Sequence, residues 1–149
     1  MATQPISPIR APDPEQIVEQ WKGAVSRGEM TLFGSLYAAD AQLLVPLSAE
    51  PLRGREAIQQ YETAVSSAFP GATLKITRPI SRGDIVAVEW EYSGTNSGPL
   101  AAPDGLLPPT NRAVTLRGAS FLRFNSDGLI VEEHRYYDRS SLLQQLGLQ

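Results

Sequence analysis

The sequence predicts an α+β fold in which N-terminal helices pack on one face of a curved antiparallel or mixed sheet. Three observations support this class. Between residues 14 and 69, apolar residues recur mostly at helical spacing. From Leu74 onward their period changes to two, which is typical of strands. The strands then follow one another through short turns, and helices followed by a run of hairpins favour an α+β domain.

The composition is that of one globular domain of 149 residues, 42% of them hydrophobic. A net charge of −3 argues against nucleic-acid or membrane-surface binding, because both need clustered Lys and Arg. The absence of cysteine excludes disulfides and thiolate metal sites and fits a reducing compartment. No apolar run reaches membrane-spanning length. We expect a cytoplasmic protein with a Pro-rich, disordered lead at residues 1–12 and a single domain at residues 13–149.

The helical half begins at Asp13, an N-cap residue that precedes Pro14. Gly28 is expected to end this first helix. A second short helix is predicted at residues 30–37, and a third at residues 55–69. The apolar stripe of the third helix contains Ile58, Tyr61, Val65 and Ala68.

The strand half is predicted to contain the segments 42–45, 74–80, 85–93, 113–124 and 129–137. Residues 97–111 are rich in Gly and Pro, so we expect a loop that is more mobile than the strands and shapes a pocket entrance. Asp138 is expected to be the N-cap of a short final helix rather than a catalytic group, because leucines follow it at helical distance.

Several short motifs, in order, resemble those of the SnoaL-like polyketide cyclases in the nuclear transport factor 2-like superfamily. They lie at residues 36–41, 54–58, 68–71, 94–98, 107–110, 121–138 and 145–147. The similarity spans roughly residues 14–148. It implies a cone-shaped fold with a deep apolar pocket, commonly in a dimer. The family's best-known activity is ring closure of polyketide esters by intramolecular aldol chemistry, without a metal or cofactor.

Alternation within the strands assigns side chains to faces. Val86, Val88, Trp90 and Tyr92 share one face of their strand, opposite Glu89 and Glu91. In the last strand, Glu133, Arg135 and Tyr137 share a face opposite His134. If the strands are neighbours, one side of the sheet could collect Glu89, Glu91, Arg117, Glu133 and Arg135. That side either faces water or lines the pocket, and both interpretations stay open.

The resemblance favours the pocket and implies that Glu133 is the acid–base carboxylate, since the family carries one on its last strand. Glu133 would remove a proton from carbon next to a carbonyl, and Arg135 or Arg117 would stabilise the enolate. We expect Glu133 to share an enclosed pocket with Arg135 and with Glu89 or Glu91. The sequence departs from the family in two places, because Arg135 stands where Trp is frequent and Asn96 where His is common.

The aromatic residues Trp21, Tyr37, Tyr61 and Tyr137 are candidates for substrate binding, although core packing is the better explanation for each of the first three taken alone. His134, the single histidine, could be a general base, but its position opposite Glu133 favours a subunit contact. One histidine and scattered carboxylates give no metal signature. We also expect a homodimer formed through the apolar face of strand 85–93.

The leading function is cofactor-independent acid–base catalysis on a small carbonyl compound, by aldol cyclisation or isomerisation. An epoxide hydrolase of the limonene epoxide hydrolase kind is the first alternative. Those enzymes use an Arg-x-Asp pair and a further Asp, where this chain has Glu89-Trp90-Glu91 and Arg135. The second alternative is a domain that binds a small molecule without turning it over.

Overall fold

A computed structural model describes residues 13–77, 79–102 and 104–149. The predicted lead at residues 1–12 lies outside the described residues. Helices α1 (Pro14–Arg27), α2 (Met30–Ser35) and α3 (Arg55–Ala68) come first along the chain, as expected. The side chain of Asp13 caps α1 by accepting a hydrogen bond of 3.0 Å from the backbone N–H of Glu15, and Gly28 ends the helix with a φ of 68°.

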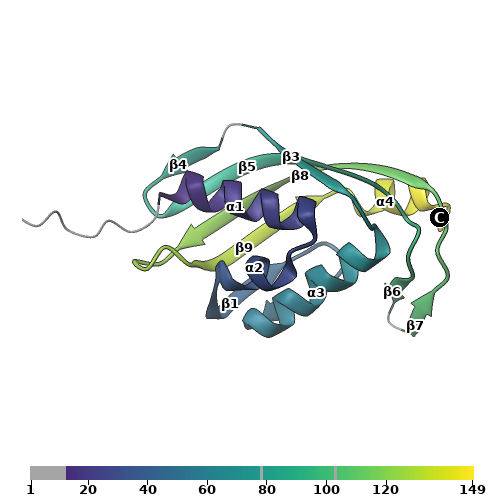
Figure 1. The fold of residues 1–149 in the computed structure, drawn as a ribbon, viewed down its shortest axis with the longest axis horizontal. Helices are drawn as coiled ribbons and strands as arrows, with labels where there is room; N and C mark the ends of the chain where they lie inside the picture. The colour runs from purple at the N-terminus through teal and green to yellow at the C-terminus, as the bar shows by residue number, and fades with distance from the viewer. Residues whose placement is uncertain (1–12, 78, 103) are drawn as a thin grey trace, which may run out of the picture.

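The main sheet has seven strands, of which six lie in the order β2-β1-β9-β8-β5-β3, with β4 paired to β5. The strands are β1 (Tyr37–Leu44), β2 (Leu52–Arg53), β3 (Thr73–Ile76), β4 (Ile80–Arg82), β5 (Ile85–Thr95), β8 (Ala113–Phe124) and β9 (Ile130–Tyr137). Strands β1 and β9 run parallel and the other pairs antiparallel, so the sheet is mixed. The sheet curves around α1, and α1, α2 and α3 lie on its inner side (Figure 1).

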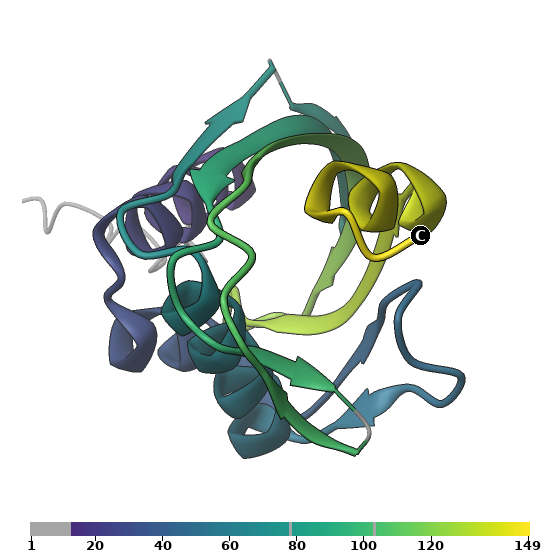
Figure 2. The same cartoon turned by 90° about the vertical axis from the view of Figure 1, so that its right-hand side faces the viewer.

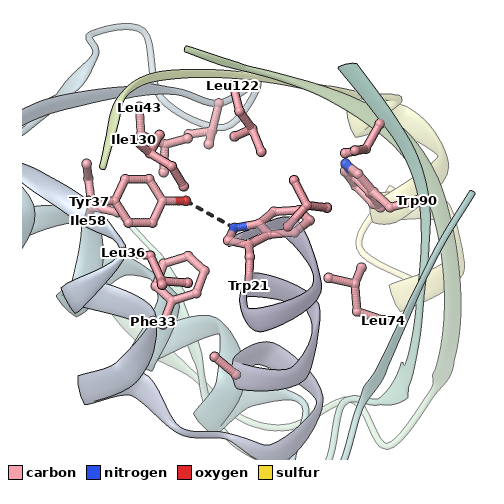
Figure 3. Close-up of a cluster of buried hydrophobic side chains, with 14 of the residues drawn as sticks. Trp21, Phe33, Leu36, Tyr37, Leu43, Ile58, Leu74, Trp90, Leu122 and Ile130 are labelled. Carbon is pink, nitrogen blue, oxygen red and sulfur yellow. Dashed lines mark hydrogen bonds between the residues drawn. The ribbon is translucent and has the colours of Figure 1, made fainter. Parts of the chain in front are cut away.

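The hydrophobic core fills the space between the helices and the inner face of the sheet (Figure 3). Trp21 of α1 is 3% exposed and lies between Tyr37 of β1 and Trp90 of β5. Val86, Val88 and Trp90 of β5 are buried in this core by the protein's own helices. The expectation that a second subunit covers this face is therefore wrong.

Three boundaries differ from the sequence prediction. Strand β1 begins at Tyr37, within the segment predicted as helix, because its parallel pairing with β9 supplies hydrogen bonds that local helical propensity cannot outweigh. The predicted strand 74–80 is divided into β3 and β4, consistent with Pro79, which has no backbone N–H to donate. The predicted loop 97–111 contains a hairpin of β6 (Leu100–Ala102) and β7 (Gly105–Leu107). Its mobility stays a prediction.

Helix α4 (Arg139–Leu146) and the β6–β7 hairpin lie at the same end of the molecule, across the opening of the curved sheet (Figure 2). Asp138 caps α4, and its side chain accepts a hydrogen bond of 3.2 Å from the N–H of Ser141, as predicted. Within the described ranges, no helix combines the length and the apolar character needed to cross a membrane.

Candidate active site

A cavity of about 190 Å³ lies on the inner side of the sheet. Its walls come from α1, α3, β3, β5, β6, β8, β9 and α4 and are mainly apolar. Aromatic rings supply much of the wall, namely Trp21, Tyr61, Phe69, Trp90, Tyr92 and Tyr137. Leu100 and Ala101 of β6 also contribute, so the Gly- and Pro-rich segment does help to shape the cavity. Glu62 and Arg135 are its charged lining groups within the described part of the chain.

Arg135 of β9 is held between two carboxylates. Its Nε donates a hydrogen bond of 2.9 Å to Oε2 of Glu133, and its Nη2 donates one of 3.3 Å to Oε1 of the same residue. Its Nη1 donates to Oε1 of Glu62 on α3. The Arg135 and Glu62 side chains are only 11% and 6% exposed, and that of Glu133 is fully buried. The three groups form a buried cluster with two potential negative charges and one positive charge.

Both carboxylate oxygens of Glu133 accept hydrogen bonds from neighbouring side chains. Tyr37 donates its hydroxyl to Oε1 at 2.5 Å, and Ser120 donates its hydroxyl to Oε2 at 2.9 Å. With the two bonds from Arg135, these contacts occupy the approximately four lone-pair sites of a carboxylate. Glu133 does not line the cavity. It is therefore an anchor for Arg135 in this geometry, with no oxygen presented to a ligand.

Two tryptophans fix the direction of these hydroxyl protons. The indole N–H of Trp21 donates to the Tyr37 hydroxyl at 3.1 Å, and that of Trp90 donates to the Ser120 hydroxyl at 3.1 Å. An indole N–H can only donate, so each hydroxyl must turn its own proton toward Glu133. Figure 3 shows the Trp21–Tyr37 contact inside the core. Trp21 and Tyr37, predicted as substrate-binding residues, thus have a structural role, and only Trp21 also lines the cavity.

Glu62 differs from Glu133 because it faces the cavity. Oε1 accepts from Arg135, while Oε2 receives no hydrogen bond from any residue that the structure describes. Glu62 was not among the site residues predicted from the sequence. Its signal was available, because Glu62 follows Ile58 by four positions and precedes Val65 by three, which places an acidic side chain on the apolar stripe of α3.

Burial and charge shift the pKa values of the cluster. Burial raises the pKa of Glu62, and the negative charge of Glu133 raises it further, although Arg135 opposes both effects. Burial disfavours the charged form of Arg135, yet the attraction of Glu133 and Glu62 holds its pKa well above the usual range. Burial, reinforced by the charge of Glu133, raises the pKa of Tyr37, so its hydroxyl stays protonated.

Tyrosine hydroxyls give the cavity wall further polar groups. Burial raises the pKa of Tyr61, Tyr92 and Tyr137 alike. After burial, the interaction with Tyr61 raises the pKa of Tyr137 further. The three tyrosines are therefore neutral hydrogen-bonding groups rather than bases. Both Tyr61 and Tyr137 line the cavity, where the sequence analysis expected them.

The predicted partners Glu89, Glu91 and Arg117 lie on the other side of the sheet, which corrects the expectation that they join Glu133. Glu133 is opposite Leu122 and Leu122 is opposite Val86, so Glu133 shares the inner face with the apolar residues of β5. Glu91 is opposite Arg117 on the outer face, where the Arg117 side chain is 82% exposed. The prediction failed because alternation orders the faces within a strand and leaves the register between strands open.

His134 also lies on the outer face, as its position opposite Glu133 implies. Its Nε2 is 2.7 Å from Oε1 of Glu132, and it does not line the cavity. Asn96, which stands where the family often has His, is fully buried and bonds the carbonyls of Ala68 and Gly98. Within residues 13–77, 79–102 and 104–149, no cluster of His, Cys, Asp or Glu could hold a metal ion.

Comparison with known proteins gives a consistent result. The model of a family described as the SnoaL-like domain matches residues 18–133. No curated protein matches the chain. A solved structure of a candidate SnoaL-like polyketide cyclase from Jannaschia sp. CCS1 is similar in fold, with 17% identity, 99% of each chain covered and a TM-score of 0.79.

Two further solved structures have higher sequence identity. One is a hypothetical protein with a ketosteroid isomerase-like fold from Catenulispora acidiphila, in complex with trimethylamine. It is 27% identical over 90% of this chain and 94% of its own, with a TM-score of 0.73. The other is IdmH, a candidate polyketide cyclase from Streptomyces antibioticus. It is 26% identical over 91% of this chain and 99% of its own, with a TM-score of 0.73.

Proposed function

The chain belongs to the SnoaL-like domain family, and we propose that it is a cofactor-independent acid–base enzyme that acts on a small carbonyl compound by aldol cyclisation or isomerisation. One observation carries the proposal, namely the buried Glu62–Arg135–Glu133 cluster beside an apolar cavity. Structures named as candidate polyketide cyclases, and one with a ketosteroid isomerase-like fold, agree with this class of chemistry.

The reaction would begin with removal of a proton from the carbon next to the carbonyl. The electron pair of the C–H bond moves into the enolate, and negative charge develops on the carbonyl oxygen. Arg135 has five N–H groups, and three of them bond the two carboxylates. The other two have no acceptor among the described residues and can stabilise the enolate oxygen.

The cavity size favours a small substrate. Its volume of about 190 Å³ is below the range of about 300–1,000 Å³ that is common for drug-sized ligands. Aromatic walls bind apolar rings through their faces and edges. A compact ketone with one or two rings fits these dimensions.

A carbon-acid exchange assay tests this function. The protein is mixed with 2-tetralone in D₂O, and loss of the proton signal next to the carbonyl is followed by NMR. We expect acceleration over buffer, and we expect Glu133→Gln to slow the protein-dependent exchange roughly 10²-fold because Arg135 loses its anchor. The outer-face variant Glu89→Gln is the matched control and should exchange at the wild-type rate. No acceleration by the wild-type protein would contradict the proposal.

The same cluster supports a second candidate function, epoxide hydrolysis. Glu62, the carboxylate that lines the cavity, could take a proton from water and return it to the opened epoxide oxygen, while Arg135 donates a hydrogen bond to that oxygen. An epoxide hydrolase/cyclase-like enzyme, SalBIII, has a similar fold with a TM-score of 0.72. Turnover of 1-methylcyclohexene oxide to a diol, without exchange of 2-tetralone, would favour this alternative. Binding of both probes without turnover would indicate a binding domain.

We also propose a homodimer, formed through the outer face of the sheet. Phe121 and Tyr136 are 48% and 54% exposed there, and their rings pack edge to face with centroids 6.1 Å apart. Arg123 and Glu132 lie on the same face, so two copies related by a twofold axis could pair unlike charges.

A further inference from the structure

A second, smaller cavity of about 90 Å³ lies between α1 and α3. Ser26, Arg27 and Ser66 contribute polar groups to its wall. A cavity needs roughly 10–15 Å³ to hold one water molecule, so this one has room for several. Arg27, Gly28 and Gly71 are exposed members of its lining, which indicates that it reaches the protein surface.

The two cavities share a thin wall. Four residues line both of them, namely Val25, Glu62, Phe69 and Tyr92. Val25 and Phe69 have no proton to transfer. Burial raises the pKa of Tyr92 far above neutrality, so its hydroxyl does not ionise. Glu62 is therefore the group in this wall that can take up and release a proton, and its carboxyl borders both cavities.

The hydrogen bonds of the cluster assign different tasks to its two carboxylates. Glu133 accepts from Tyr37, Ser120 and Arg135 and has no lone pair available. Glu62 accepts only from Arg135 and keeps Oε2 without a donor among the described residues. A proton-transfer group must reach the substrate directly, within about 2.6–3.2 Å or through one water. Glu62 lines the cavity and has an oxygen available for such a contact, whereas Glu133 does not line it.

Resting on the proposed acid–base function, we infer that Glu62 is the catalytic residue that takes the substrate proton in the main cavity and exchanges it with water in the second cavity. The C–H bond breaks, its proton moves to Oε2 of Glu62, and its electron pair forms the enolate. The proton then exchanges with water on the other side of the wall. Glu62 returns a proton to carbon, and no oxidant or co-reactant is needed. Glu133 is a positioning residue that aligns Arg135.

The first experiment compares the two carboxylates by exchange of 2-tetralone protons in D₂O over a range of pD. Glu62→Gln should lower the rate roughly 10²-fold or more, and Glu62→Asp should restore part of it. A base must be ionised, so the wild-type rate should fall on acidification through the raised pKa of Glu62. The pD–rate profile of Glu62→Gln should lose this acidic limb, that is, the fall in rate at low pD. Glu133→Gln should be slower than wild type and retain the limb.

The results for the two variants distinguish failure of this inference from failure of the proposed function. If Glu62→Gln keeps the rate and the limb while Glu133→Gln loses the limb, the enzyme is an acid–base catalyst with Glu133 as its base. If the wild-type protein gives no exchange, the proposed function fails instead. In that case ¹³C NMR of labelled glutamate carboxyls, assigned with Glu62→Gln, tests Glu62 directly. The inference would be overturned if the Glu62 carboxyl titrates like a surface glutamate and its chemical shift does not change when 2-tetralone is added.

The second experiment tests the route to solvent. Ser66→Leu places an apolar side chain in the second cavity, and Thr63→Leu is the matched control on the exposed side of the same helix. We expect Ser66→Leu to slow deuterium incorporation into 2-tetralone without weakening its binding, because Glu62 exchanges with solvent more slowly. Thr63→Leu should behave as wild type. Equal incorporation in both variants would exclude the second cavity as the solvent side.

Discussion

Arg135 shows how one side chain can organise a site. It is buried, and the structure surrounds it with Glu62, Glu133 and their hydrogen-bond partners. Removing one partner of a buried ion pair costs about 3–5 kcal/mol, because the remaining charge loses its compensation. The cluster holds one more carboxylate than guanidinium, so its balance depends on the protonation of Glu62. This imbalance gives the site a pH dependence that can be measured in folding as well as in activity.

Glu62 should make the protein less stable as the pH rises. Burial raises its folded-state pKa above the unfolded value of about 4.3. Its contribution is therefore fully present below the unfolded pKa and is lost as the pH rises through the folded pKa. Arg135 and Glu133 on β9 face this carboxyl, and the nearby hydroxyls of Tyr61 and Tyr92 stay neutral.

Urea unfolding of wild type and Glu62→Gln checks this sign. The difference in unfolding free energy should shift in favour of Glu62→Gln as the pH rises above about 4.3 and through the raised pKa of Glu62, because glutamine cannot ionise. Glu56→Gln, on the exposed side of α3, serves as the control and should follow wild type. A constant difference between wild type and Glu62→Gln at all pH values would contradict the prediction.

Among the elements, the segment between β5 and β8 is joined to the C-terminal end of α3 by hydrogen bonds. The amide nitrogen of Asn96 donates to the carbonyls of Ala68 and Gly98 at 3.0 and 2.9 Å. Gly98 lies so close to α3 that a Cβ there would stand 1.9 Å from the carbonyl oxygen of Ser67. The base of the β6–β7 hairpin, which forms part of the cavity wall, is thus held by the buried amide of Asn96 together with backbone hydrogen bonds such as that from Gly98 to Ala68.

Asn96→Ala should lower the unfolding free energy by about 1–3 kcal/mol or more, since it leaves buried backbone groups without partners. The Oδ1 of Asn96 also accepts from the N–H of Thr110 at 2.8 Å, so both ends of the segment lose a contact. The control is the exposed neighbour Ser97→Ala, which should change stability by less than about 0.5 kcal/mol. Urea midpoints measure both, and equal midpoints would refute the role of Asn96.

At the scale of the whole molecule, the two faces of the sheet have separate tasks. The inner face carries the core, Glu133 and Arg135, and the helices cover it. The outer face carries charges of both signs together with exposed Phe121 and Tyr136. Contiguous exposed apolar surface marks candidate interaction sites, and these two rings are in contact with each other. The dimer expected from the sequence therefore requires the face opposite to the one first assigned.

Light scattering at micromolar concentration should give the mass of a dimer. Phe121→Arg combined with Tyr136→Glu should give a monomer, because it replaces the apolar centre of the contact with charges. Thr63→Arg, on the exposed surface of α3, should leave the dimer intact. A monomer mass for the wild-type protein, or a dimer that survives the double substitution, would disprove an interface on this face.

The α+β class, the caps at Asp13 and Asp138 and the family could all be predicted from the amino-acid pattern. These features depend on residues close together in the chain, such as a capping side chain and the N–H it binds two or three positions later. Alternation likewise gave the shared face of Glu133 and Arg135, because positions two apart in a strand point the same way.

The contacts between residues of different elements could not be predicted in this way. A shift of one residue in strand register moves a whole set of side chains to the other face, so the sequence pattern could not decide whether Glu133 joins Glu89 or Val88. The contact between Glu62 and Arg135 joins a helix to a strand 73 positions later. Local spacing encodes neither relation. Both follow from how the sheet curves and how α3 packs on it, which burial of the whole core determines.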